Sequence, residues 1–178
     1  MSKTAFLFPG QGVQKCGMGK DFYENSSQAA KLFEEASEAL GLDMKALCFE
    51  ENDRLDQTEY TQVALVTTYL AMCRELESRG VKPDITAGLS LGEYAAIAAA
   101  GAMSDLDAIR LVRKRGMLMQ NTVPAGEGAM CAILALDEKK IEEVLNEIPD
   151  VTIANYNCPG QIVITGEGKA VEQAAEVL

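Results

Sequence analysis

A serine flanked by glycines lies at the centre of residues 88–92, which read Gly-Leu-Ser-Leu-Gly. Residues 84–90 have the length and apolarity of a buried strand, and the alanine-rich residues 91–100 are typical of a helix. This pattern between a strand and a helix is typical of a nucleophile elbow, which exposes the serine hydroxyl on a sharp turn. It therefore predicts an acyl-accepting nucleophile at Ser90, with the backbone N–H of Leu91 as an oxyanion donor. An ordinary glycine-rich turn is the alternative.

A second glycine-rich loop lies near the start of the chain. Gly10-Gln11-Gly12 follows residues 4–8, whose apolar run predicts a short buried strand. Because parallel strands gather their loops at their carboxyl ends, we expect this loop to approach Ser90. The backbone N–H or the side-chain amide of Gln11 is then a candidate second donor to the oxyanion. A plain turn is the alternative, and the Lys-Ser/Thr pair of a phosphate loop is absent.

Arg115 lies in a predicted helix, residues 105–121. The residues three and four positions away from it are all apolar: Leu111, Val112, Leu118 and Met119. This spacing predicts that the stem of Arg115 lies on the buried stripe of the helix. A guanidinium directed inward requires a partner, and a carboxylate matches its planar fork best. The partner of Arg115 is then either a carboxylate of the substrate or an Asp or Glu of the protein itself, and the sequence leaves both alternatives open.

The elements that position these residues fall into two groups, separated by a glycine- and proline-containing linker over 124–128. In the first group, helical spacing also predicts a helix from Ser26 or Ser27 to about Leu40 and another over 61–79. The second group has the predicted order strand, helix, strand, strand, helix, over residues 129–136, 137–148, 151–155, 161–165 and 169–178.

The second group is one strand short of the βαββαβ order of a ferredoxin-like sheet. The sequence also stops at residues 176–178, inside an apolar helical pattern without a C-cap glycine. Both features lead us to expect an incomplete chain.

Composition and charge exclude several classes of function. The formal net charge of −11 disfavours nonspecific binding to nucleic acid or to an anionic membrane. The start of the chain lacks a signal-peptide core, and the longest near-apolar stretch, 95–103, is too short for a bilayer span, so we expect a cytoplasmic protein. Five scattered cysteines and no histidine predict reduced, buried thiols and no metal site, with Cys158, beside Pro159-Gly160 in a predicted turn, as the candidate for exposure.

Four motifs stand in one order along the chain: Phe8-Pro9-Gly10-Gln11-Gly12, Gly88-Leu89-Ser90-Leu91-Gly92-Glu93-Tyr94, Arg115-Gly116 with Met119-Gln120, and Asn155-Tyr156-Asn157 leading to Pro159-Gly160-Gln161. Together they resemble the malonyl-CoA:acyl carrier protein transacylases over essentially the whole chain. The resemblance implies an α/β fold with a hydrolase-like, parallel-sheet large subdomain over residues 1–124. It also implies an inserted ferredoxin-like small subdomain over 125–178, and both subdomains are expected to be incomplete.

The resemblance implies a ping-pong reaction of fatty acid biosynthesis that needs no cofactor. A serine takes malonyl from malonyl-CoA, and the acyl-enzyme passes it to the phosphopantetheine thiol of acyl carrier protein. Ser90 matches the nucleophile, and Gln11 and Leu91 match the oxyanion-hole positions. Arg115 matches the residue that grips the malonyl carboxylate. The positions that match the lining of the cleft between the subdomains are Met119, Asn155 and Gln161.

Two positions depart from the family. Many relatives have a histidine where this chain has Leu89, and the family's catalytic histidine has no counterpart, because the sequence contains no histidine. Loss of the base typically costs several orders of magnitude in rate, so we expect the isolated chain to be inactive or nearly so. Two alternatives stay open. One is an esterase or thioesterase that does not need Arg115, and the other is a noncatalytic chain that binds a complementary, histidine-bearing C-terminal fragment.

Overall fold

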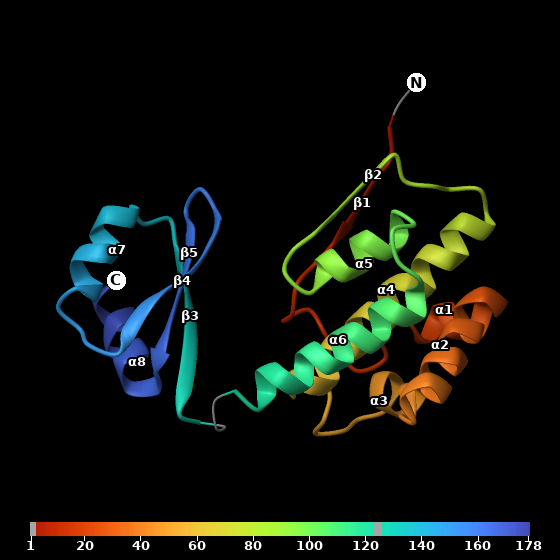
Figure 1. Cartoon of the computed structure of the whole chain (residues 1–178), viewed down its shortest axis with the longest axis horizontal. Coiled ribbons are helices and arrows are strands. Elements are labelled where there is room, and N and C mark those ends of the chain that lie inside the picture. Colours follow the sequence, from red (N-terminus) through yellow and green to blue (C-terminus); the bar gives the residue numbers. More distant parts are fainter. Residues whose placement is uncertain (1–2, 123–125) are drawn as a thin grey trace. The chain divides into compact units, whose positions relative to one another are not determined.

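The computed structural model describes residues 3–122 and 126–178. The chain divides into two compact units, Met1–Gln120 and Asn121–Leu178, and Figure 1 labels their elements. Each unit contains both helices and strands, so the predicted α/β class is confirmed. The boundary predicted between residues 124 and 125 falls outside the described residues.

Within residues 3–120, the first unit combines a two-stranded parallel sheet with six helices. Strand β1 (Ala5–Phe8) pairs with β2 (Ile85–Gly88), and their registers place Phe8 opposite Gly88. Both strands therefore end at the same level, as the sequence predicted for the two glycine loops that follow them. The helices are α1 (Lys20–Asn25), α2 (Ser27–Leu40), α3 (Met44–Phe49), α4 (Thr58–Ser78), α5 (Gly92–Ala99) and α6 (Asp105–Gln120).

The core of the first unit is built around α4. Residues 61–68 of this helix are all buried, which is typical of a helix that other elements surround. Helices α2 and α6 pack against it. The ring of Tyr69 lies 5.9 Å from the ring of Phe8, measured between centroids, and this contact joins α4 to the sheet.

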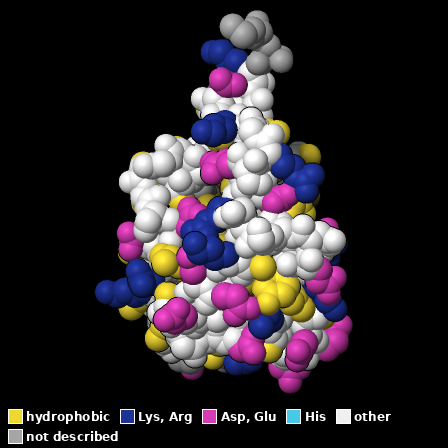
Figure 2. All heavy atoms as spheres, turned by 90° about the vertical axis from the view of Figure 1, so that its right-hand side faces the viewer, with side chains coloured by type: hydrophobic (Ala, Val, Ile, Leu, Met, Phe, Trp, Pro, Cys, Tyr) yellow, Lys and Arg dark blue, Asp and Glu magenta, His cyan; other side chains and the backbone are white. Residues whose placement is uncertain are grey.

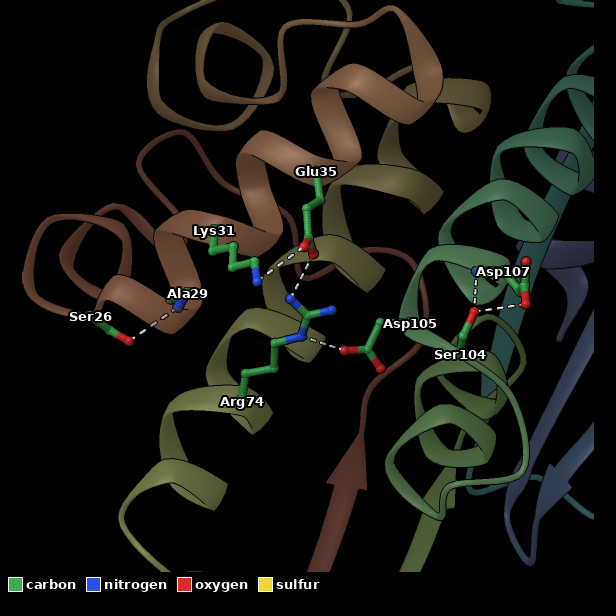
Figure 3. A network of polar contacts seen from close by, with 8 residues as sticks. All are labelled: Ser26, Ala29, Lys31, Glu35, Arg74, Ser104, Asp105 and Asp107. Carbon is green, nitrogen blue, oxygen red and sulfur yellow. Dashed lines mark hydrogen bonds and ion pairs between the residues drawn. The ribbon is translucent and has the colours of Figure 1, made fainter.

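A polar network ties α2, α4 and the start of α6 together (Figure 3). Arg74 Nη1 donates to Glu35 Oε2 at 2.8 Å, and Arg74 Nε donates to Asp105 Oδ2 at 2.7 Å. Lys31 Nζ lies 3.8 Å from Glu35 Oε1. Because the Arg74 side chain is only 25% exposed, its two charged hydrogen bonds are stronger than those of a surface pair and fix the three helices relative to one another.

The prediction that both strands of the parallel sheet are buried was wrong for one face. Helix α5 packs on the sheet, and Thr86 Oγ1 donates to Ala96 O at 2.9 Å across this contact. On the opposite face Leu7 is 73% exposed and Ile85 is 62% exposed. Side chains alternate between the two faces of a strand, so a sheet that the described helices cover on one face leaves every second residue accessible.

Two short helices, α1 and α3, were not predicted. In α3, Asp43 caps the first turn by accepting from Lys45 N and Ala46 N at 3.0 and 2.9 Å. Met44 and Leu47 are fully buried one turn apart. A helix of six residues repeats its apolar spacing only once, which is too little to stand out from polar flanks.

Within residues 126–178, the second unit holds a three-stranded antiparallel sheet and two helices. The elements are β3 (Gly128–Leu134), α7 (Glu138–Leu145), β4 (Val151–Cys158), β5 (Gln161–Glu167) and α8 (Gly168–Val177). Their chain order is the predicted βαββα, and the sheet order is β3-β5-β4. A separate core lies between the sheet and the helices, with Ile141, Ile164 and Ala174 fully buried.

Acidic and basic side chains are interspersed over the face of the molecule that Figure 2 shows. In the described part of the chain, no helix combines the length and apolarity that crossing a bilayer requires.

Candidate active site

Ser90 lies in a sharp turn between β2, which ends at Gly88, and α5, which begins at Gly92. Its φ angle is +53°, in the left-handed region that non-glycine residues adopt at a cost. Its side chain is exposed. The predicted elbow conformation is therefore present, and it directs the hydroxyl away from the core.

The two flanking glycines are required by close backbone packing. A Cβ at Gly88 would lie 2.1 Å from the carbonyl carbon of Gly92, and a Cβ at Gly92 would lie 2.2 Å from Phe8 O. Real side chains do not approach backbone atoms this closely. The Leu89 N–H also donates to Phe8 O at 3.0 Å, which holds the turn against the end of β1.

Leu91 begins the turn into α5. Its side chain is 1% exposed and anchors the elbow in the core. The next amides close the first helical turn: Glu93 N donates to Ser90 O, and Tyr94 N donates to Leu91 O, both at 3.2 Å. Within the described residues the Leu91 N–H has no acceptor, so it is available at the positive end of the helix.

Arg115 of α6 reaches Ser90. Its Nη2 donates to Ser90 Oγ at 3.0 Å, and its Nη1 donates to Gln62 Oε1 at 2.7 Å. The guanidinium carbon also lies 5.8 Å from the centroid of the Tyr94 ring. Both hydrogen-bond acceptors are neutral, so the guanidinium meets no carboxylate of the described protein.

The expectation that Arg115 lies on the buried stripe of its helix was wrong. Of its four apolar neighbours only Val112 is buried, and Leu111, Leu118 and Met119 are 47%, 62% and 47% exposed. The buried stripe of α6 is instead Ala108, Ile109, Val112 and Gly116. At Gly116 a Cβ would lie 2.8 Å from the Glu59 Cα of α4, so the small residues determine which side of α6 faces inward.

Gln62 links Arg115 to the loop after β1, and the sequence analysis missed it. Its Nε2 lies 3.4 Å from Gln11 Oε1 and 3.3 Å from the Met119 sulfur. Gln11 Nε2 in turn donates to Thr58 Oγ1 at 3.2 Å. The signal was a glutamine inside an apolar helical run, because a buried amide must find polar partners.

The predicted residues Ser90, Leu91, Arg115, Gln11 and Met119 thus come together in the first unit. Asn155 and Gln161 lie in the second unit, on β4 and β5. Gln161 Oε1 accepts from Asn157 Nδ2 at 3.1 Å, and Asn155 is exposed. That these two residues line a cleft with Ser90 stays a prediction.

The cysteines take no part in this site. Burial raises the pKa of the Cys48 thiol and of the Cys73 thiol to about 12, so both remain protonated. Cys16 is exposed, which corrects the expectation that its thiol is buried, and Cys158 is exposed beside the turn at Pro159-Gly160. Among the residues with described positions, no group of three or more Cys, Asp and Glu side chains could hold a metal ion.

Comparisons with known proteins agree over most of the chain. A family model described as an acyl transferase domain matches residues 5–178. A malonyl CoA-acyl carrier protein transacylase of Bacillus subtilis (strain 168) is 50% identical, and the match covers 99% of this chain and 57% of the relative.

Solved structures give the same result. The structure of a malonyl CoA-acyl carrier protein transacylase from Clostridium perfringens has a TM-score of 0.89 at 45% identity, covering 99% of this chain and 57% of that one. A type II PKS acyl-carrier protein in complex with its malonyl-transacylase matches with a TM-score of 0.89 at 42% identity, over 98% of this chain and 58% of that one. The chain therefore spans just under three fifths of the length of these relatives.

Proposed function

Because the chain belongs to the acyl transferase domain family, we propose that it is part of an enzyme that transfers malonyl from malonyl-CoA to the phosphopantetheine thiol of acyl carrier protein, in fatty acid biosynthesis. The observation that carries the proposal is the hydrogen bond between Arg115 and Ser90. It places a permanent cation beside a nucleophile, where a carboxylate on the acyl group would lie.

In the first half-reaction Ser90 Oγ attacks the thioester carbonyl of malonyl-CoA. A general base takes the Ser90 hydroxyl proton as the Oγ–C bond forms and negative charge develops on the carbonyl oxygen. The C–S bond then breaks, and the proton passes from the base to the CoA sulfur to release the thiol. The backbone N–H groups of Leu91 and Gln11 are the proposed oxyanion donors, since Gln11 Nε2 already donates to Thr58. In the second half-reaction the base takes the proton of the carrier thiol, whose sulfur attacks the malonyl-serine ester. The Oγ–C bond then breaks, and the proton passes to Ser90 Oγ. The proposed reaction needs no cofactor.

Selectivity for malonyl follows from Arg115. A malonyl carboxylate would replace the hydrogen bond from Arg115 to the neutral Ser90 hydroxyl with a charged pair, which is roughly twice as strong. An acetyl group offers no such partner. Tyr94 and Gln62 hold the guanidinium from two sides and orient its fork. Met119, Asn155 and Gln161 are proposed to line the remainder of the acyl and pantetheine cleft.

The proposed reaction requires a general base. In this family the base is a histidine, and these 178 residues contain no histidine. By resemblance to the family, the base is a histidine downstream of the small subdomain. We assign residues 1–124 to the hydrolase-like subdomain and 125–178 to the ferredoxin-like one. Support for the second assignment comes from the sheet order, in which β5 lies between β3 and β4 as in a split βαβ unit.

The test joins this chain to the part of the Bacillus subtilis relative that it does not cover. The fusion should transfer malonyl from malonyl-CoA to carrier protein, and intact mass should show malonyl on Ser90. Ser90→Ala should remove both signals. A folded fusion that hydrolyses neutral acyl esters with no preference for malonyl would replace the proposal with an esterase. A folded fusion with no acyl-serine would exclude serine acyl transfer.

A further inference from the structure

Helix α6 presents a second face that the reaction above does not use. Arg110, Leu111, Lys114 and Leu118 are all exposed, and their spacing places them on one side of the helix. Leu111 is 47% exposed and Leu118 is 62% exposed. From Arg110 to Leu118 the helix rises about 12 Å, so the face is long enough to contact a second helix. We name this set the α6 outer face.

The charge of the α6 outer face is opposite to that of the whole chain. The formal net charge is −11, yet residues 108–126 contain four basic residues and no acidic one. Two of the four are engaged. Arg115 donates to Gln62 and Ser90, and Arg113 Nη1 lies 2.9 Å from Glu59 Oε2 while its guanidinium stacks 4.6 Å from the Tyr60 ring centroid.

The other two cations point to solvent. Arg110 Nη1 lies 3.6 Å from Asp107 Oδ1, but both side chains are more than half exposed, so this pair is weak. Lys114 forms no ion pair with any carboxylate of the described residues. The α6 outer face therefore offers two available positive charges beside two large apolar side chains.

The α6 outer face also adjoins the nucleophile. Leu111 and Leu118 stand four positions before and three positions after Arg115, so they flank its stem on the helix surface. The Arg115 guanidinium lies 3.0 Å from Ser90 Oγ. A partner seated on this face is thus close to the acylated serine.

We propose that the α6 outer face is the docking surface for the acyl carrier protein, which it binds through an acidic helix with exposed apolar side chains. This inference rests on the proposed function, which requires a protein-borne thiol to reach Ser90. Acidic groups of the carrier would pair with Arg110 and Lys114, and its apolar side chains would cover Leu111 and Leu118. The phosphates of coenzyme A could pair with the two cations, but they would leave the two leucines exposed. The presence of both cations and leucines on one face therefore favours a protein partner.

The experiment measures binding and needs no catalysis. The phosphopantetheine-bearing acyl carrier protein of Bacillus subtilis is labelled with a fluorophore and titrated with the 178-residue chain at low and at physiological salt. Binding should weaken as salt increases. The double variant Arg110→Glu/Lys114→Glu should weaken it about tenfold or more, and Leu111→Ser should weaken it at both salt concentrations.

The matched control is Lys20→Glu/Lys31→Glu. Both lysines are exposed helix residues of the same unit, and the change in net charge is identical. This control should bind the carrier within about twofold of the unmodified chain, because long-range charge alone is a small effect at physiological salt. Circular dichroism spectra verify that every variant is folded.

Three outcomes overturn the inference. The unmodified chain does not bind the carrier, the Arg110→Glu/Lys114→Glu variant binds it normally, or the control variant loses as much carrier affinity as that variant. A fourth is that the Arg110→Glu/Lys114→Glu variant loses malonyl-CoA affinity as strongly as carrier affinity, which would assign the cations to coenzyme A. Ser90→Ala should bind the carrier normally. Loss of malonyl transfer in the fusion with intact carrier binding would therefore refute the proposed chemistry and leave the docking surface standing.

Discussion

Arg115 Nη2 donates a hydrogen bond to Ser90 Oγ at 3.0 Å, across 25 positions of sequence. A guanidinium cannot act as the base that activates a serine, because it stays protonated at all relevant pH values. Its position instead suits a charge that arrives with the substrate. The first two predictions follow from this geometry.

Replacing Arg115 with alanine should abolish discrimination between malonyl and acetyl groups. We expect the affinity for malonyl-CoA to fall roughly 100-fold, which is the usual loss for a charged hydrogen-bonded pair, while acetyl-CoA binding stays almost constant. Isothermal titration of both thioesters measures this. Arg110→Ala removes the same charge from an exposed position of the same helix and should change neither affinity. Equal losses for both thioesters in Arg115→Ala would contradict the assignment.

Replacing Gln62 with glutamate should prevent a substrate carboxylate from pairing with Arg115. Gln62 Oε1 already accepts from Arg115 Nη1 at 2.7 Å, so a carboxylate at this position would form an ion pair with the guanidinium that is proposed to bind malonyl. We expect malonyl-CoA to bind no better than acetyl-CoA. Gln62→Leu removes the acceptor without adding charge, and should cost about tenfold in malonyl affinity. If Gln62→Glu bound malonyl-CoA normally, Gln62 would not be positioning Arg115.

Replacing Gly92 with alanine should destabilise the first unit by about 3 kcal/mol or more, because the new methyl group would overlap Phe8 O. Urea unfolding of the variant measures the loss. Gly168→Ala is the matched control, since a Cβ there meets nothing closer than 3.9 Å and the residue begins α8. It should be neutral or slightly stabilising. If Gly92→Ala were as stable as this control, the backbone around the elbow would be able to move and accommodate the methyl group.

The stability of the first unit should depend on pH through Glu75. A hydrogen bond from Ser26 and the nearby Arg79 guanidinium hold the pKa of the Glu75 carboxyl below its ordinary value of 4.5. Because the folded pKa is the lower one, the charged carboxylate stabilises the fold above pH 4.5, and this contribution disappears as the pH falls below that value. Glu75→Gln should therefore be less stable than the parent chain near neutral pH.

Urea unfolding at several pH values tests this dependence. The difference between the parent chain and Glu75→Gln should shrink progressively as the pH falls below 4.5. Glu143→Gln removes the same charge from an exposed position of α7 and should show little difference at any pH. A stability difference for Glu75→Gln that stays constant with pH would mean that the carboxylate charge is not what stabilises this contact.

Strong local signals made much of the fold predictable. The helix that ends at Leu40 and the turn at Ser90 have caps, glycines and repeated apolar spacing, and both were predicted close to their observed bounds. The exposure of Leu7 and Ile85 was not predictable, since an apolar strand reads the same whether one face or both are covered.

The candidate site divides in a similar way. Ser90, Leu91 and Gln11 follow from glycine motifs that act through local backbone geometry. The contact between Arg115 and Ser90 was not derivable from the helix pattern, which placed the arginine on the wrong stripe. Gly116 decides the buried side, because it lets α6 approach α4 closely, and the small residue Ala108 is buried on the same helix. Gln62 was missed because the sequence shows a glutamine inside an apolar helical run but does not show its partner Arg115, which lies 53 positions away.

The left-handed backbone conformation of Ser90 means that the residue that would be most stable at this position is not the residue that the proposed reaction requires. At φ +53° a serine is strained and a glycine is not, so Ser90→Gly should raise the free energy of unfolding by about 1 kcal/mol. The same change would remove the proposed nucleophile. Selection for thermostability alone would thus replace this serine, and its presence at a strained position is what the proposed catalytic role predicts.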